Sequence, residues 1–156
     1  MTLSDSNQTA PDAFDPARAG WTQRRSNPFF DVIAPFWQKQ EADGFIFGML
    51  CTPNTLNNAG NMHGGALTAF CDQALGGTLI ETIQLADGPR APPARSVTVQ
   101  LNVQFLAAIK PLDFMIGRCR ITRRTRSLVF LDGLVEVNGA AVASVQAVFK
   151  LVKPAA

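Results

Sequence analysis

A long, nearly uncharged segment in the middle of the chain constrains the fold most. Residues 64–85 follow the only histidine, carry two charged side chains, Asp72 and Glu81, and are rich in Ala, Leu, Thr and Ile. This composition predicts one mostly buried helix of about 20 residues. The other apolar segments have a different periodicity, so the chain combines this helix with strands.

Alternation of apolar and polar residues predicts strands on both sides of the helix. In residues 97–105, Val, Leu and Phe occupy every second position, which indicates a strand with one apolar face and places Thr98 on its polar face. Turn-like segments separate four further predicted strands, at 45–51, 112–122, 128–137 and 142–152. A helix after the first strand, followed by consecutive strands, predicts an α+β fold with about five strands.

The N-terminal part of the chain is less regular. Residues 28–41 are rich in aromatic side chains and predict a short helix interrupted near Pro35, which either packs in the core or lines an apolar ligand pocket. Residues 1–20 are rich in Asp, Ser, Pro and Ala without periodicity and predict a flexible tail. The 156-residue chain fits one domain, over residues 21–156.

Composition disfavours several classes of protein. A net charge of +2 argues against nucleic-acid binding as the main role. The sequence shows neither a membrane-spanning apolar stretch nor a signal-peptide core, so a cytoplasmic protein without a membrane partner is expected. One histidine and three scattered cysteines, Cys51, Cys71 and Cys119, predict no disulfide framework, no metal site and no cofactor. Cys71 is expected to be a packed thiol, because adjacent helical residues point about 100° apart and it cannot share the direction of Asp72.

The residues around the start of the helix are chemically capable. Gly64 and Gly65 occupy its first turn, where backbone N–H groups lack intrahelical partners and can stabilise a carbonyl oxygen that gains negative charge. The alternative is that two glycines only let the helix start against a close-packed backbone. His63, just before them, is a cap or packed ring as readily as a functional group.

Asp72 is the strongest candidate for an acid or base. It lies among Ala, Phe, Cys and Leu on a helix with little other charge, and an unpaired carboxylate in apolar surroundings is costly. Such carboxylates are candidate functional groups. The alternative is that Asp72 lies on a narrow solvated stripe of the helix.

The spacing of Gly64 and Asp72 bears on assembly. Eight residues of helix separate them by ~12 Å along the axis, so they cannot both touch one reacting carbon in the same chain. If both are catalytic, the simplest solution is a two-fold dimer in which Gly64 of one subunit faces Asp72 of the other.

Asn57, Gly60, His63-Gly64-Gly65 and Asp72 together resemble the signature of the hotdog-fold acyl-CoA thioesterases of the phenylacetic-acid-pathway type, close to the 4-hydroxybenzoyl-CoA thioesterase superfamily. The resemblance covers residues 30–152. It implies a hotdog fold, a long central helix wrapped by an antiparallel sheet of about five or six strands, with the active site at a dimer interface. It leaves open whether dimers pair into tetramers.

The resemblance also implies roles for individual residues. Asp72 would be the nucleophile or general base, and the Gly64 N–H would polarise the thioester carbonyl of an acyl-CoA, which is then hydrolysed to free acid and CoA. Asn57 would position the carbonyl or the attacking water, His63 would support the loop, and Thr98 would supply a hydroxyl near the acid.

Coenzyme A is part of the substrate in this hypothesis. Gly65 and three arginines, Arg123, Arg124 and Arg126, are candidate substrate-binding residues, because guanidinium groups pair well with phosphate oxygens. The alternative for the arginines is a solvated hairpin.

Two other functions compete with hydrolysis. A non-catalytic acyl-CoA-binding module of the same fold would bind without releasing CoA. The second is a hotdog hydratase. Hydratases of this fold carry an Asp five residues before the catalytic histidine, and this chain has Asn58 there, so its resemblance to them is weaker.

Overall fold

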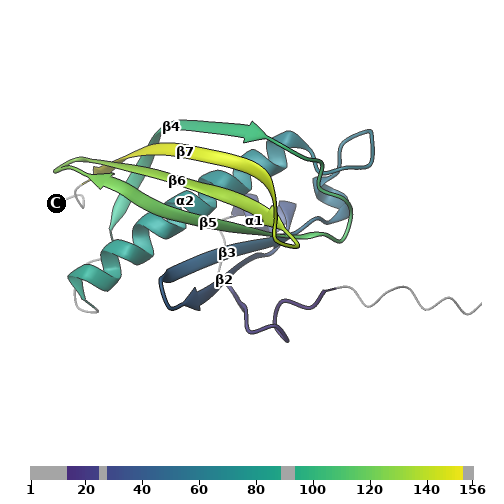
Figure 1. The fold of residues 1–156 in the computed structure, drawn as a ribbon, viewed down its shortest axis with the longest axis horizontal. Coiled ribbons are helices and arrows are strands. Elements are labelled where there is room, and N and C mark those ends of the chain that lie inside the picture. The colour runs from purple at the N-terminus through teal and green to yellow at the C-terminus, as the bar shows by residue number, and fades with distance from the viewer. Residues whose placement is uncertain (1–13, 25–27, 89–93, 153–156) are drawn as a thin grey trace, which may run out of the picture.

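The computed structural model describes residues 14–24, 28–88 and 94–152. One long helix lies inside a curled antiparallel sheet, which confirms the α+β hotdog architecture (Figure 1). The described part of the sheet has seven strands, slightly more than predicted. The elements are, in chain order, β1 (Thr22–Gln23), α1 (Pro28–Ile33), β2 (Phe36–Glu41), β3 (Gly44–Leu50), a 3-10 turn (Pro53–Thr55), α2 (Gly64–Asp87), β4 (Arg95–Phe105), β5 (Phe114–Arg124), β6 (Leu128–Val137) and β7 (Ala140–Val152).

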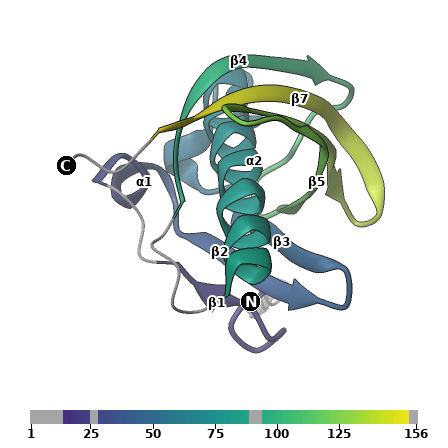
Figure 2. The ribbon, with the colours of Figure 1, turned by 90° about the vertical axis from the view of Figure 1, so that its left-hand side faces the viewer.

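The strand order explains how the sheet encloses the helix. The order is β1-β2-β3-β5-β6-β7-β4, so β4, which follows α2 in the sequence, lies at one edge beside β7. Viewed from the side, β4 and β7 cover α2 from above while β2 and β3 cover it from below (Figure 2). The outer edge of β4 pairs with no strand in the described part of the chain, and an open edge of this kind can pair with a second chain.

The helix α2 supplies one side of the main core. Its buried residues include Phe70, Leu75 and Leu79, which are fully excluded from solvent. Gly77 lets the helix approach the sheet closely, because a Cβ there would lie 2.6 Å from the ring of the fully buried Phe47. The helix ends at Gly88, whose φ of +87° favours glycine. None of the helices in the described part of the chain combines the length and the hydropathy that a membrane crossing requires.

The prediction of one interrupted helix over residues 28–41 was wrong in its second half. The helix α1 ends at Ile33, and residues 36–41 form β2. This strand pairs antiparallel with β3, with Phe36 opposite Met49 at one end and Glu41 opposite Gly44 at the other. Pro35 disfavours helical geometry at Ala34, and the hydrogen bonds that make β2 a strand come from β3. Phe36 and Phe47 stack with ring centroids 5.4 Å apart, and Phe30 and Phe36 pack in the core, whereas Phe29 is exposed.

Part of the predicted N-terminal tail has tertiary contacts. Residues 15–20 form a turn with backbone hydrogen bonds, and Phe14 lies with its ring centroid 4.7 Å from that of Phe114 on β5. Trp21 packs edge-on against the same Phe114 ring, and these two residues form a small buried cluster with Ile46. Residues 1–13 lie outside the described residues.

Candidate functional site at the start and middle of the long helix

His63 caps the N-terminus of α2. Its Nδ1 accepts a hydrogen bond of 2.9 Å from the Gly65 N–H, and its backbone carbonyl accepts from Leu67. With Nδ1 placed as the acceptor, Nε2 is the ring nitrogen left to donate a hydrogen bond. The exposed ring satisfies one of the four N–H groups that a helix start leaves unpaired.

The two glycines at this helix start differ in what surrounds them. A Cβ on Gly65 would lie 2.9 Å from the His63 Nδ1, so the cap itself requires a glycine there. A Cβ on Gly64 would meet only the Phe105 ring, at an ordinary contact distance of 3.4 Å, and Gly64 is not among the glycines with positive φ. A close-packed backbone therefore explains neither glycine: Gly65 is needed for the His63 side-chain cap, and Gly64 has no steric reason in the described part of the chain.

Asn57 holds the loop before the helix. Its Oδ1 accepts hydrogen bonds from the backbone N–H groups of Ala59 (2.9 Å) and Asn61 (3.2 Å), and its own N–H donates to the Asn61 carbonyl. Gly60, with φ +77°, makes the reversal inside this loop possible. The Asn57 Nδ2 donates no hydrogen bond to another described residue, so both N–H donors of the side-chain amide are left for a ligand.

An open pocket of about 380 Å³ lies over this helix start. Asn57, Asn61 and Gly64 contribute polar groups to its lining. The other lining residues are apolar and come from the helix start, the end of β4 and the following loop: Met62, Leu67, Phe105, Leu106, Ala107, Ala108 and Ile109. Small-molecule sites typically combine apolar side chains with a few polar groups in this way.

Asp72 and Thr98 form the second part of the site. The Thr98 hydroxyl donates a hydrogen bond of 2.8 Å to the Asp72 Oδ1, which joins α2 to β4. Asp72 is half-buried, and it forms no ion pair with any residue in 14–24, 28–88 or 94–152. The carboxylate therefore keeps its second oxygen free for a substrate or a water.

A β-bulge turns Thr98 toward the helix. Thr98 pairs with Phe149 and Gln100 with Val148, so Val99 is the extra residue on β4. Without the bulge, Thr98 would share the outward face with Gln100, as strict alternation predicts. The structure instead places Thr98 on the same side as Leu101 and Val103, which pack on the core. Bulges commonly re-aim a side chain in this way next to functional sites.

The structure does not bring the two parts of the site together within one chain. The pocket at Gly64 includes neither Asp72 nor Thr98. Gly64 and Asp72 both lie on α2, eight residues apart, so helix geometry separates them by ~12 Å along the axis, as the sequence predicts.

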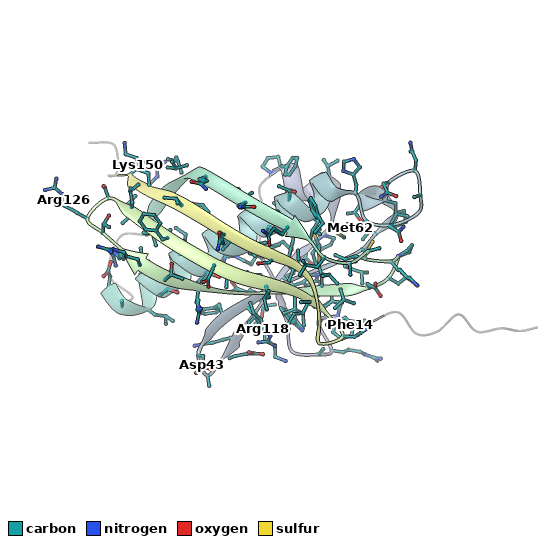
Figure 3. All side chains as sticks on the ribbon, turned by 45° about the horizontal axis from the view of Figure 1, so that its top comes forward. Phe14, Asp43, Met62, Arg118, Arg126 and Lys150 are labelled. Carbon is teal, nitrogen blue, oxygen red and sulfur yellow. The ribbon has the colours of Figure 1, made fainter. Side chains whose placement is uncertain are left out.

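The five arginines near the β5–β6 hairpin divide into two groups. Arg118 pairs with Glu41 and Glu136, and Arg120 pairs with Asp132. Arg123, Arg124 and Arg126 are exposed and form no ion pair within the described residues. Arg126 and Lys150 lie at the end of the sheet away from Met62, so the hairpin is distant from the Gly64 pocket of its own chain (Figure 3).

The cysteines are poor nucleophiles here. Burial raises the pKa of the Cys71 thiol to about 12 and that of Cys119 to about 12. Both thiols are therefore protonated near neutral pH. No group of three or more His, Cys, Asp or Glu side chains is arranged to hold a metal ion among the residues that the structure describes.

The fold and the sequence identify the family. A long helix wrapped by an antiparallel sheet matches solved hotdog thioesterase structures in fold. The family model of the thioesterase superfamily matches residues 59–143, which is more than half of the chain. The chain therefore belongs to the thioesterase superfamily and is an enzyme of the thioester hydrolase class, as the sequence predicted.

Individual relatives agree with this assignment. PA0474 of Pseudomonas aeruginosa, whose name proposes an esterase, is 27% identical over 128 residues, 81% of this chain and 90% of that protein. A hypothetical thioesterase of Streptococcus pneumoniae, solved with coenzyme A, has a TM-score of 0.63 at 23% identity, over 75% of this chain and 88% of that one. PaaI of Escherichia coli, from the phenylacetic acid degradation operon, has a TM-score of 0.61 at 15% identity, over 70% and 72%.

Sequence reasoning missed Phe105. Its side chain is 57% exposed although it ends the apolar face of β4, and its ring lies against Gly64. The alternation of the strand predicts on which face Phe105 lies. Its position at the pocket follows only from the path of β4 past the start of α2.

Proposed function

We propose that this protein is an acyl-CoA thioesterase in which Asp72 is the nucleophile or general base and the Gly64 N–H binds the thioester carbonyl. The observation that carries the proposal is the 2.8 Å hydrogen bond between Thr98 and Asp72, which fixes the only half-buried carboxylate of the first part of α2. The Gly64 N–H and the Asn57 Nδ2, neither of which donates to another residue that the structure describes, support it from the other end of the site.

In this mechanism each residue has one task. The thioester carbonyl oxygen accepts a hydrogen bond from the Gly64 N–H at the positive end of the helix dipole, which stabilises the charge that develops there. Thr98 holds the Asp72 carboxylate through one oxygen. His63 occupies the Gly65 N–H, which leaves the Gly64 N–H at the first position of the helix available to the carbonyl, and Asn57 orients the carbonyl or the water.

Two routes lead to the same products. With Asp72 as base, it takes a proton from water, the water oxygen bonds to the thioester carbon, and the carbon–sulfur bond breaks. The proton then passes to the CoA thiolate. With Asp72 as nucleophile, its oxygen bonds to the thioester carbon, CoA leaves, and water cleaves the resulting anhydride. Heavy oxygen on Asp72 after a single turnover in heavy-oxygen water would establish the nucleophilic route, because only cleavage of the anhydride at the aspartyl carbon leaves the label there.

Two subunits complete the site. We propose that antiparallel α2 helices face each other so that Gly64 of one chain meets Asp72 of the other, which gives two equivalent sites. The midpoint between Gly64 and Asp72 is Thr68, a half-buried residue, so the two-fold axis passes close to it. The open edge of β4 is available for the same interface.

Cross-linking tests this arrangement. Thr68→Cys is expected to cross-link to its copy with a short bismaleimide, because both side chains lie at the axis. Thr82→Cys, exposed on the same helix and ~21 Å further along it, is the matched control and should not cross-link. Cross-linking at Thr82 alone would contradict the proposed dimer.

The arginines remain candidate CoA ligands under this proposal. Arg124 lies on the same cross-strand row as Thr98, because Thr98 pairs with Phe149, Phe149 with Val129, and Val129 with Arg124. Three strand spacings of ~4.8 Å place it ~14 Å from Thr98. The free guanidinium groups of Arg123, Arg124 and Arg126 therefore lie within reach of a long, phosphate-bearing substrate whose thioester is at Asp72.

Thiol release from a panel of acyl-CoAs tests the function. We expect wild-type protein to release CoA and Asp72→Asn to lose turnover by ~10³-fold or more while CoA binding survives. An active Asp72→Asn enzyme would contradict the assignment. Binding without release by wild type would indicate an acyl-CoA-binding module instead.

A further inference from the structure

We propose that Phe105 is a specificity-determining residue, whose ring sets the maximum size of the acyl group in the pocket over Gly64. The inference rests on the proposed function, since it concerns the substrate of that same site. It assigns the apolar part of the pocket to the acyl chain and its polar part to the thioester carbonyl.

The position of the ring relative to Gly64 is the first argument. Three ring atoms of Phe105 lie 3.4 to 3.9 Å from where a Gly64 Cβ would be, so the ring covers the helix start at contact distance. A carbonyl bound to the Gly64 N–H therefore has the Phe105 ring beside it. An acyl chain that extends from that carbonyl over Gly64 meets the ring at contact distance.

The surroundings of the ring are the second argument. Phe105 belongs to neither buried cluster of the described residues, and its ring forms no aromatic pair with another described residue. With 57% of its surface exposed, it adds little to the core. The adjacent Leu106 is 55% exposed as well, so two large apolar side chains at the pocket are left uncovered by the fold.

The mixed lining of the pocket is the third argument. It combines polar groups from Asn57, Asn61 and Gly64 with apolar side chains from Met62, Leu67, Leu106 and Ile109. A thioester carries the same two kinds of group, a carbonyl next to an apolar chain. Phe105, whose ring lies beside Gly64, is the largest side chain of the lining.

Substitutions that change the ring in opposite directions test the inference. Phe105→Ala enlarges the pocket and Phe105→Trp reduces it. For each variant and for wild type, kcat/KM is measured over straight-chain acyl-CoAs from two to sixteen carbons, and Kd is measured for non-hydrolysable thioether analogues of the same lengths. Leu134→Ala, which removes an exposed apolar side chain from a different part of the sheet, is the control. The size of the particle in solution is measured for every variant.

We expect the ratio of long-chain to short-chain kcat/KM to rise ~10-fold in Phe105→Ala and to fall in Phe105→Trp, with wild-type ratios in Leu134→Ala. The thioether affinities should follow the same order. An equal loss for all chain lengths, or a loss explained by dissociation of the particle, would overturn the inference.

The two proposals fail in different ways. If wild type hydrolyses nothing but the thioether affinities still shift with the Phe105 variants, the thioesterase proposal fails and the pocket assignment stands. If hydrolysis depends on Asp72 but neither profile responds to Phe105, the reverse holds.

Discussion

Two pairs of glycines on the same helix, Gly64–Gly65 and Gly76–Gly77, serve different purposes. In each pair one glycine is required by packing: a Cβ would lie 2.9 Å from the His63 ring at Gly65 and 2.6 Å from the Phe47 ring at Gly77. The other member meets only ordinary contacts, with Phe105 at Gly64 (3.4 Å) and with Phe149 at Gly76 (3.6 Å).

The surroundings of the two unconstrained glycines separate them. Gly76 faces Phe149 of the sheet, whereas Gly64 borders an open pocket and has a free N–H. A glycine inside a helix costs ~1 kcal/mol relative to alanine. A glycine that the fold does not require, at the edge of a pocket, therefore indicates close approach by a ligand, and the two pairs make this inference testable with a single type of substitution.

Gly64→Ala should have the largest effect, and on activity alone. The added methyl group would point toward Phe105 and restrict the approach of a carbonyl to the N–H, so we expect kcat/KM to fall ~100-fold while the melting temperature stays within a few degrees of wild type. Gly76→Ala, the same change on the same helix, is the control for activity. Full activity of Gly64→Ala would remove the functional reason for this glycine.

Gly77→Ala should have the largest effect on stability. Its methyl group would overlap the ring of Phe47, which is fully buried and cannot move away, so overpacking is expected to cost ~1–3 kcal/mol, partly offset by helix propensity. Denaturant unfolding measures the loss. Combining it with Phe47→Leu should recover part of the stability, and a neutral Gly77→Ala would show that the helix can shift away from the sheet.

Gly65→Ala should act through the cap. The methyl group displaces the His63 ring and breaks its hydrogen bond with the Gly65 N–H, which is expected to cost ~1 kcal/mol. In a double-mutant cycle, His63→Ala should add little to Gly65→Ala, because both remove the same interaction. Fully additive losses would show that His63 contributes to stability in another way.

Gly76→Ala should have the smallest effect and the opposite sign. The site has room for a methyl group at 3.6 Å from Phe149, and alanine loses less backbone entropy than glycine in a helix. We expect a gain of up to ~1 kcal/mol in the free energy of unfolding, measured by urea denaturation. A loss of stability would indicate that the backbone at Gly76 needs closer contact than these distances show.

The sequence predicted the extent of the long helix better than the arrangement of the candidate site residues around it. The helix was predicted over 64–85 and extends over Gly64–Asp87, because its composition and its start signals are local. The family resemblance implied that Thr98 lies near Asp72, and in the structure the Thr98 hydroxyl lies 2.8 Å from the Asp72 Oδ1. The different roles of Gly64 and Gly65 depend on two rings, those of Phe105 and His63, and Phe105 is 41 residues from Gly64 in the sequence.

What the sequence by itself determined is the class of fold, the extent of the long helix and the polar residues at its start, since hydrophobic period and turn residues act over a few neighbouring positions. Three features depended on tertiary structure. Residues 36–41 became a strand because β3 supplies their hydrogen bonds, β4 reached the edge beside β7, and the bulge at Val99 turned Thr98 from the outer face toward Asp72. Each depends on pairing between strands far apart in the sequence, and no local pattern encodes such a pairing.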